Sequence, residues 1–275
     1  MAVLEENAAK LKPRMSTATV ESSKTRYLVK SADTEARPLL ICNGLGQSIE
    51  ILFPLMEQFK DRTVICFDVP GVGRSKSNTC VRTIPDYARF ALALMSQIGI
   101  DQFDILGISW GGAVAQQMAF AAPDRVGKLV LAITSAGGIG SWWGTPIALS
   151  EVMFPLRFLS KTYGEFIGPW MYGGETALQP EQFKEYSKHA LRPTMEGYFA
   201  QVKAMCSWTS LPWLKTLKQP TLVLAGQFDG LIPFPNQILL AQQIPQARLH
   251  VFPADHLLMY TRRREVGTLI SSFLS

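Results

Sequence analysis

Residues 104–115 read DILGISWGGAVA and place Ser109 between an apolar run and an alanine-rich run. The first run is typical of a buried strand, and the second favours a helix. A strand that turns into a helix within one residue crowds its neighbours, so the positions two before and two after the serine must lack a Cβ. Gly107 and Gly111 occupy those positions. The stretch therefore predicts a G-x-S-x-G turn that exposes the Ser109 hydroxyl above a sheet.

Short apolar runs bounded by turn residues recur along the chain and predict strands. They cover residues 25–30, 38–44, 63–71, 103–109, 128–134, 221–229 and 247–253. Helical patterns lie between them. One spans residues 84–99, with an apolar stripe formed by Tyr87, Phe90, Ala91, Leu94 and Ile98. Continuously apolar strands that alternate with helices predict a parallel α/β sheet buried on both faces.

The alternation stops after Ser135 and resumes near Pro220. We interpret residues 137–210 as a helical cap over the C-terminal edge of the sheet, where open α/β sheets bind ligands. Five of the six tryptophans lie in this interval or just beyond it, namely Trp142, Trp143, Trp170, Trp208 and Trp213. These side chains line a substrate site or simply pack the insertion on the core.

The remaining residues divide into a core and an N-terminal segment. Residues 25–136 and 211–275 are the predicted α/β core, and residues 1–24 are a predicted flexible extension. The N-terminal segment carries Glu5 and Glu6 where a signal peptide needs apolar residues. No run is long and apolar enough to span a membrane. These features predict a cytoplasmic protein.

Composition excludes several classes of function. The 275 residues carry a formal charge of +5, but the basic side chains are scattered apart from the run 262–264, which suits a solvated helix face. The sequence lacks the interleaved basic and aromatic residues that are typical of nucleic-acid binding. It also lacks the residue spacing of a zinc site. The four cysteines lack a CxxC spacing and are predicted to be reduced thiols: Cys42, Cys66, Cys80 and Cys206.

A serine nucleophile needs a base to take its proton and a carboxylate to orient that base. After a G-x-S-x-G turn the chain order is serine, acid, histidine. Three histidines follow Ser109: His189 in a polar helical segment, His250 within a strand, and His256 in the loop after the last strand. Only His256 is expected at the C-terminal edge of the sheet.

The acid has three candidates. Asp229 ends the strand 221–229 at the same edge, whereas Asp124 follows a proline at a helix end and resembles a cap. Asp255 is adjacent to His256, a spacing that usually turns two side chains apart. The sequence therefore predicts a triad of Ser109, Asp229 and His256, with no cofactor.

Acyl transfer also needs two backbone N–H groups for the oxyanion. Trp110, directly after the serine, and Leu45, in the glycine-flanked segment 43–46, are the predicted donors. A phosphate-binding role is the alternative for that segment, but the segment lacks the third glycine of G-x-G-x-x-G and contains no GK[ST]. The predicted substrate contacts are Asn43, Trp142, Trp143 and Trp170.

From about Thr25 to its end, the chain resembles the α/β-hydrolase superfamily. Several stretches are similar to intracellular depolymerases of medium-chain-length poly(3-hydroxyalkanoate): PLLICNGLG, FDVPGVGRS, GISWGGAVAQQMA, MYGG, WTS, QPTLVLAGQFDGLIP and HLLMYTR. The family's nucleophile falls on Ser109, its acid on Asp229 and its base on His256. The departures are the N-terminal extension, Gly230 in place of a usual proline, and the cap stretch SWWGTPIALSEVMF.

The resemblance implies an α/β-hydrolase fold: a mostly parallel sheet flanked by helices, with a cap. It also implies a serine esterase that cleaves a stored aliphatic polyester to hydroxyalkanoic acids or oligomers, with the granule surface as a second partner. A carboxylesterase of small or medium-chain esters is the main alternative. Carbon–carbon bond hydrolysis and perhydrolysis share the triad, and a non-catalytic binding protein is a further alternative.

Overall fold

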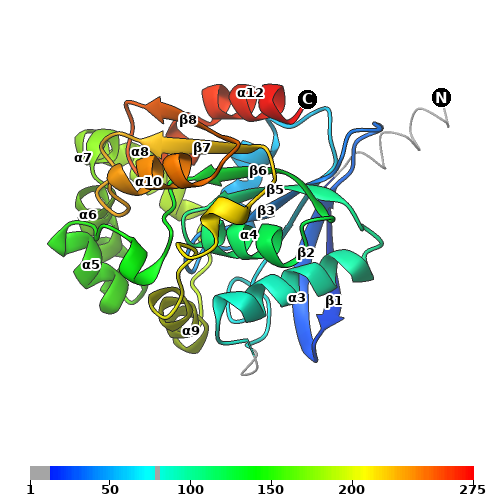
Figure 1. Cartoon of the computed structure of the whole chain (residues 1–275). Helices are drawn as coiled ribbons and strands as arrows, with labels where there is room; N and C mark the ends of the chain where they lie inside the picture. The colour runs from blue at the N-terminus through cyan, green and yellow to red at the C-terminus, as the bar shows by residue number, and fades with distance from the viewer. Residues whose placement is uncertain (1–12, 78–80) are drawn as a thin grey trace, which may run out of the picture.

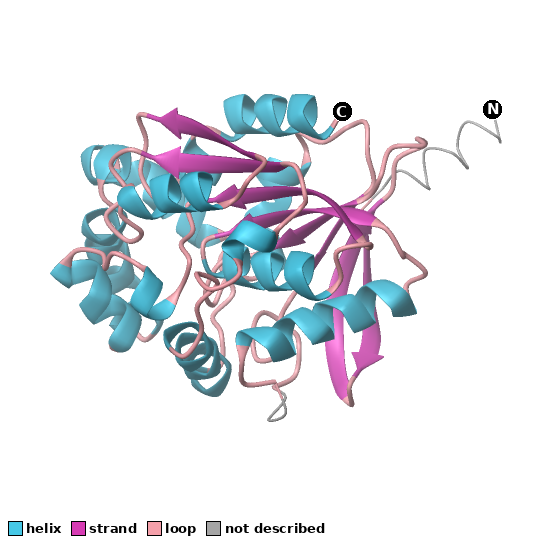
Figure 2. Cartoon of the chain, viewed as in Figure 1, coloured by secondary structure: helices cyan, strands magenta, loops and turns pink. Residues whose placement is uncertain are grey.

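The computed structural model describes residues 13–77 and 81–275, and within them eight strands form one sheet (Figure 2). The strands are β1 (Arg14–Val20), β2 (Ser23–Lys30), β3 (Leu39–Cys42), β4 (Val64–Phe67), β5 (Phe103–Ile108), β6 (Val126–Ala132), β7 (Thr221–Gly226) and β8 (Ala247–Phe252). Their order across the sheet is β1-β2-β4-β3-β5-β6-β7-β8. The β1–β2 and β2–β4 pairs are antiparallel, and every other pair is parallel. This arrangement confirms the predicted fold class.

Helices connect the strands and cover both faces of the sheet. They are α2 (Phe53–Met56), α3 (Ile84–Gln97), α4 (Trp110–Ala121), α5 (Pro146–Met153), α6 (Lys161–Tyr172), α7 (Gly174–Leu178), α8 (Pro180–Lys188), α9 (Met195–Cys206), α10 (Pro235–Gln243), α11 (Leu258–Thr261) and α12 (Arg263–Leu274). Short 3₁₀ turns are η1 (Ile49–Leu52), η2 (Gly138–Gly140), η3 (Leu156–Phe158) and η4 (Leu214–Thr216).

The helix α3 begins at Ile84, directly after a capping box formed by Thr83 and Asp86. The Thr83 hydroxyl accepts a hydrogen bond from the Asp86 N–H, and the Asp86 carboxylate accepts one from the Thr83 N–H. This capping box satisfies N–H groups that have no partner within the helix. The predicted apolar stripe of α3 is buried, except that Ile98 just beyond the helix is only partly covered.

The central strands β3, β4, β5 and β7 are buried on both faces, as their continuous apolar character predicts, whereas the edge strands β1 and β8 are largely exposed. In β3, Leu40 and Cys42 pack in a cluster that includes residues of α3 and α4. The alternate residues Leu39 and Ile41 pack in a second cluster that includes residues of α2 and α12. Because alternate side chains of a strand point to opposite faces, the sheet separates two apolar layers.

The sheet begins earlier in the chain than predicted. Residues 1–24 were expected to form a flexible extension, but Arg14–Val20 is an edge strand paired with β2, and β2 itself starts at Ser23. The polar side chains of β1 hide it from an apolar-run criterion, while its threonines and valine favour an extended backbone. Residues 1–12 of the predicted extension lie outside the described residues.

The helices between β6 and β7 gather at one end of the molecule, beyond the strands (left in Figure 1). We call residues 137–210 the cap. The two ends of the cap meet, because the Ser210 N–H donates a 2.9 Å hydrogen bond to the Ala136 carbonyl. A small apolar cluster joins cap to core, and it contains Ala148, Met171, Tyr172, Phe183, Tyr186 and Leu257.

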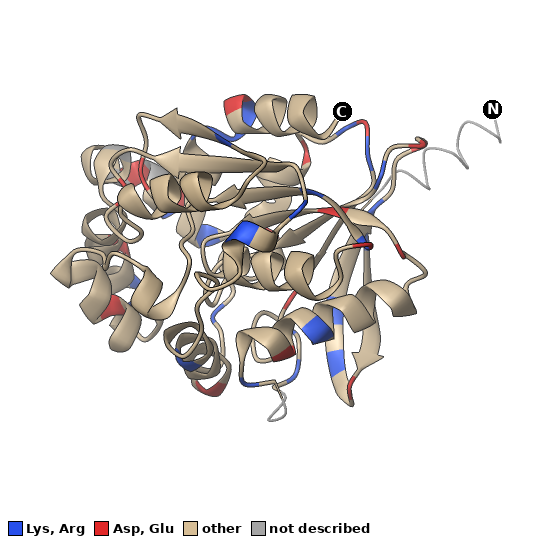
Figure 3. Cartoon of the chain, in the orientation of Figure 1, with Lys and Arg blue, Asp and Glu red and all other residues tan. Residues whose placement is uncertain are grey.

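Charged residues are distributed without a single basic face in the view of Figure 3, where Lys and Arg alternate with Asp and Glu along several elements. Within residues 13–77 and 81–275, no helix combines the length and apolar character that membrane crossing requires. Cys42 and Cys66 are buried free thiols, and Cys206 is an exposed one. Cys80 lies outside the described residues.

Candidate active site

Ser109 lies at the junction of β5 and α4 in a rarely populated backbone conformation. Its φ of 52° and ψ of −119° cost about 1–3 kcal/mol for a residue with a Cβ. Two hydrogen bonds hold it: its N–H donates to the Ala132 carbonyl at 2.9 Å, and the Thr134 hydroxyl donates to its carbonyl at 2.6 Å. The neighbouring structure thus fixes the orientation of the serine.

Close backbone approach explains the two flanking glycines. A Cβ at Gly107 would lie 2.6 Å from the Cβ of Ala115 in the following helix. A Cβ at Gly111 would overlap the carbonyl of Cys42 at the end of β3. The same contact brings the loop after β3 next to the start of α4.

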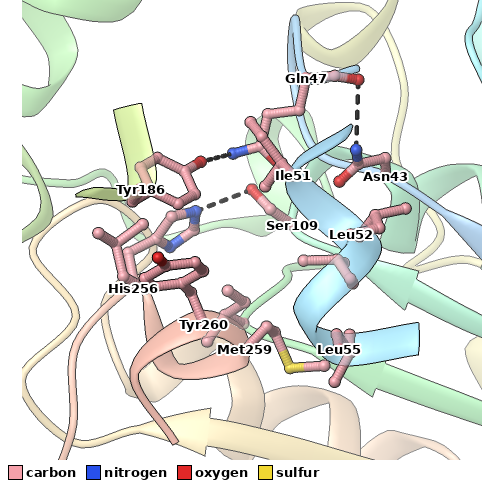
Figure 4. A pocket seen from close by; sticks show the side chains of 13 residues that line it. Asn43, Gln47, Ile51, Leu52, Leu55, Ser109, Tyr186, His256, Met259 and Tyr260 are labelled. Atoms are coloured by element: carbon pink, nitrogen blue, oxygen red, sulfur yellow. Dashed lines mark hydrogen bonds between the residues drawn. The ribbon is translucent and has the colours of Figure 1, made fainter. Parts of the chain in front are cut away.

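A chain of hydrogen bonds joins the serine to a histidine and a carboxylate. His256 Nε2 lies 3.0 Å from Ser109 Oγ, and His256 Nδ1 lies 2.7 Å from Asp229 Oδ2. Figure 4 shows a ring nitrogen of His256 directed at the serine hydroxyl, with the dashed line marking this hydrogen bond. With its proton on Nδ1, the imidazole donates to Asp229 and accepts from the hydroxyl. This is the arrangement that removes a proton from a serine nucleophile.

The carboxylate is itself held by backbone groups. Asp229 Oδ1 accepts hydrogen bonds from the N–H groups of Leu231 at 2.9 Å and Ile232 at 2.8 Å. The side chains of Asp229 and His256 are almost fully buried. Asp229 follows β7, His256 follows β8, and Ser109 follows β5, so three separate loops bring the three groups to one edge of the sheet.

The alternative candidates lie elsewhere. His189 is exposed at the end of α8, and His250 lies within β8 with its ring against Phe252. Asp255 points away from the imidazole of its neighbour, because its carboxylate accepts hydrogen bonds from the N–H groups of Thr176 at 2.6 Å and Leu257 at 2.8 Å. Asp124 is exposed on the surface.

A pocket of about 30 Å³ opens beside the Ser109 hydroxyl and His256. Its walls are mostly apolar and include Ile51, Leu55, Ile133 and Met259. Gln47 and Tyr186 supply polar atoms, and the Gln47 side-chain amide donates a 2.5 Å hydrogen bond to the Tyr186 hydroxyl. Burial raises the pKa of Tyr186 well above its usual value, so this hydroxyl remains neutral.

Two tyrosines at this site were not predicted from the sequence. Tyr186 on α8 lines the pocket, and Tyr172 at the end of α6 lies with its ring parallel to the imidazole of His256, with centroids 5.8 Å apart. Tyr172 belongs to the MYGG stretch, which gave a signal for the family but not for this contact. No local pattern marks Tyr186.

The two predicted oxyanion donors lie on adjacent segments, the loop after β3 and the start of α4. Trp110 is the first residue of α4, so its N–H has no acceptor one turn earlier in the helix. In the loop after β3, Gly44 N–H donates to the Asn43 side chain and Gly46 N–H to Gln201. Between them, Leu45 N–H has no hydrogen-bond acceptor among the residues that the structure describes.

Asn43 lines the pocket, but its side chain is occupied in holding its own loop. Its amide donates to the carbonyls of Gln47 and Ser48, and its oxygen accepts from Gly44. The pocket at Ser109 therefore receives little free hydrogen-bonding capacity from Asn43.

The three cap tryptophans predicted to contact substrate do not line the pocket at Ser109. Trp142, Trp143 and Trp170 are 52%, 61% and 57% exposed and lie on the outer surface of the cap. In their place Tyr172 and Tyr186 turn inward from the cap. An aromatic composition does not indicate which side of a helix faces the core, because that depends on the packing of the whole insertion.

Comparison with known proteins agrees with this fold. Residues 37–262 match the model of the alpha/beta hydrolase fold family, and the chain belongs to that family. It is 38% identical over 259 residues to the poly(3-hydroxyalkanoate) depolymerase of Ectopseudomonas oleovorans, covering 94% of this chain and 91% of that one. It is 26% identical over 226 residues to 3-oxoadipate enol-lactonase 2 of Acinetobacter baylyi, covering 80% and 82%.

Solved structures share the fold. The enol-lactonase of Burkholderia xenovorans LB400 superposes with a TM-score of 0.80 at 23% identity, over 94% of this chain and 99% of that one. A thermophilic esterase from Thermogutta terrifontis gives a TM-score of 0.79 at 24% identity, over 95% and 98%. Residue identity this low indicates a common architecture only.

Proposed function

We propose that this protein is a serine esterase that cleaves the carboxylic ester bonds of a medium-chain poly(3-hydroxyalkanoate). The observation that carries the chemistry is the hydrogen-bonded chain from Asp229 through His256 to Ser109, on a strained turn beside a pocket. The polymer assignment rests on the relative from Ectopseudomonas oleovorans and on the motifs shared with such depolymerases.

In this proposal Ser109 Oγ attacks the ester carbonyl carbon while His256 takes the hydroxyl proton. The negative charge that develops on the carbonyl oxygen is stabilised by the N–H groups of Leu45 and Trp110, each contributing about 3 kcal/mol. Asp229 keeps the proton of the imidazole on Nδ1 and stabilises the imidazolium. His256 then protonates the leaving oxygen, and water activated by the same base hydrolyses the acyl-enzyme.

The outer cap surface suits a water-insoluble substrate. Large apolar side chains are exposed on consecutive cap segments, including Trp142, Trp143, Phe154, Leu159, Phe166 and Trp170. Soluble proteins seldom expose so many together without a contact surface to form. We assign these side chains to adsorption on the polyester granule, within the cytoplasm.

The experiment is hydrolysis of an emulsion of medium-chain poly(3-hydroxyalkanoate), beside a series of p-nitrophenyl esters from acetate to dodecanoate. Ser109→Ala is the inactive variant. Ser150→Ala, which removes an exposed cap hydroxyl, is the matched control. The proposal expects clearing of the emulsion by the wild type and the control, and none by Ser109→Ala.

Ester cleavage without clearing would support the serine mechanism but reject the polymer, leaving a carboxylesterase of smaller esters. Cleavage that persists in Ser109→Ala would reject the mechanism. A fluorophosphonate that fails to label the wild type would indicate a binding protein without an activated serine.

A further inference from the structure

A second cavity, of about 270 Å³, adjoins the pocket at Ser109. It lies between the loop after β3 and the cap helices α6 and α8. Gln47, Ile51 and Tyr186 line both spaces, and Leu45 lines the second one. The second cavity therefore lies next to the space where a substrate binds at the serine, and its volume is close to that typical of small-ligand sites.

The second cavity has an excess of positive charge. Its walls carry four basic side chains, Arg157, Lys161, Lys188 and Arg192, against the single carboxylate of Glu165. The other walls are largely apolar or aromatic. The protein as a whole has mixed charge, so this excess is a local property of the cavity.

Two of the four basic side chains already have strong partners. The buried Arg157 guanidinium donates to the Tyr198 hydroxyl and lies 3.7 Å from the carboxylate of Glu151, so it fixes cap elements to each other. Lys188 forms a 2.6 Å ion pair with Glu185 on the same helix.

The other two basic side chains are available to a ligand. Lys161 lies 3.8 Å from Glu165, a separation too long for a close hydrogen-bonded pair. Arg192, an exposed residue that lines the cavity, has no carboxylate within ion-pair distance in the described part of the chain. A guanidinium is suited to two parallel hydrogen bonds with a carboxylate.

We propose that this cavity binds the free carboxylate end of a hydroxyalkanoate chain, with Arg192 as the main contact and Lys161 as the second. The inference rests on the proposed function. A polyester of hydroxy acids is uncharged along its length and carries one anionic group, at its acid end. A basic cavity next to the nucleophile therefore selects that end, and the enzyme shortens chains from it.

Each reaction cycle in this geometry cleaves one ester bond and consumes one water molecule. Ser109 Oγ forms a bond to the last ester carbonyl, and the bond from that carbonyl to the oxygen of the terminal unit breaks. His256 transfers its proton to the leaving oxygen, which releases one hydroxy acid from the second cavity. Water then frees the remaining chain, whose new carboxylate is the next group to be bound.

The test uses the linear dimer of 3-hydroxyoctanoate as the free acid and as its methyl ester, in which a methyl group replaces the terminal negative charge. In both substrates, cleavage of the ester bond between the two units is followed. The wild type should prefer the acid in kcat/KM. Arg192→Gln should reduce that preference about fivefold, the effect of losing one partly exposed ion pair. Lys203→Gln is the matched control, because Lys203 is an exposed basic residue of the cap that lines a different pocket.

A second measurement is independent of turnover. Ser109→Ala should bind 3-hydroxyoctanoate in calorimetry more tightly than its methyl ester, and adding Arg192→Gln should remove the difference. Equal cleavage of acid and methyl ester by the wild type would overturn the inference while leaving the esterase intact. Cleavage of neither dimer, with p-nitrophenyl esters still hydrolysed, would reject the polyester function itself.

Discussion

The ring of Tyr172 lies parallel to the imidazole of His256, so a side chain of the cap contacts the proposed base of the core. Burial raises the pKa of Tyr172, which keeps its hydroxyl neutral. The contact limits rotation of the imidazole. The cap therefore supports the geometry of the site as well as covering it.

Two substitutions of Tyr172 distinguish the role of its aromatic ring from that of its hydroxyl. Tyr172→Phe keeps the stacked ring and should retain nearly full kcat. Tyr172→Ala should lower kcat about three- to tenfold, because an aromatic contact contributes about 0.5–1.5 kcal/mol. Steady-state kinetics on p-nitrophenyl octanoate measures both. Equal losses in the two variants would indicate that the hydroxyl, not the ring, matters.

Asp229→Asn should preserve the fold and lower kcat about 10⁴-fold, as for the carboxylate of a serine protease triad. The amide oxygen can still accept the hydrogen bonds from Leu231 and Ile232, but it cannot stabilise an imidazolium. Kinetics and a thermal melt test this pair of expectations. Asp124→Asn, at an exposed position, is the control, and near-normal turnover by Asp229→Asn would move the acid role elsewhere.

Gly111→Ala should destabilise the protein by about 1–3 kcal/mol, the range for overpacking a rigid interior. The added methyl would meet the Cys42 carbonyl, which belongs to a strand and cannot move aside cheaply. Gly99→Ala is the comparison, since a Cβ there meets no atom within 4 Å and reports only the cost of its positive φ. Urea unfolding of both variants gives the difference, and equal losses would contradict the packing argument.

The two buried thiols should be unreactive in the native state. Burial raises the pKa of Cys42 to about 12 and raises that of Cys66 as well, and only the thiolate reacts. In a Cys80→Ser background, Cys206 alone should react with a thiol reagent at mildly alkaline pH, and the other two only after unfolding. Fast native labelling in a Cys80→Ser, Cys206→Ser double variant would contradict this.

The raised pKa values of the two buried cysteines predict that the stability of the protein falls at alkaline pH. An unfolded cysteine ionises near pH ~8.5. The folded-state pKa values are higher, so the contribution of Cys42 to stability is full below that pH and is lost as the pH rises toward about 12. Thermal melts across this range should therefore fall less steeply for Cys42→Ala than for the wild type.

Alanine at Trp142 and Trp143 should reduce clearing of a polymer emulsion more than hydrolysis of p-nitrophenyl butyrate. Both side chains are exposed on the cap and absent from the pocket at the serine, so small esters should not need them. Leu249→Ala, at an exposed apolar position on β8, controls for a general loss of hydrophobic surface. Equal losses on both substrates would remove the adsorption role.

The central strands are predictable from the sequence, whereas the cap contacts are not, and both outcomes have physical reasons. A strand buried on both faces must be continuously apolar. The strands β3 and β7 can therefore be predicted from their own residues, without knowing which strands pair with them. The edge strand β1 needs little apolar character, and its mixed polar and apolar residues 14–20 form no continuous apolar run. The turn at Ser109 was predictable because steric exclusion of a Cβ is a local requirement.

Contacts between distant elements were not predictable in the same way. The order of serine, acid and histidine pointed to the loops after β7 and β8, where Asp229 and His256 do meet. Tyr172 reaches His256 only because α6 folds back over the sheet, and no periodicity encodes that. Exposure of Trp142 and Trp143 likewise depends on which side of the cap faces solvent.

The hydrogen bond between Ser210 and Ala136 closes the base of the cap and has a consequence for how such enzymes diversify. Since the chain leaves and re-enters the scaffold at neighbouring points, the insertion behaves as a closed loop, whose entropic cost grows only slowly with length. Insertions of other sizes can be exchanged there without parting β6 from β7. Substrate specificity can thus change through exchange of the whole cap. Each new cap must then supply an aromatic ring that supports the histidine, as Tyr172 does here.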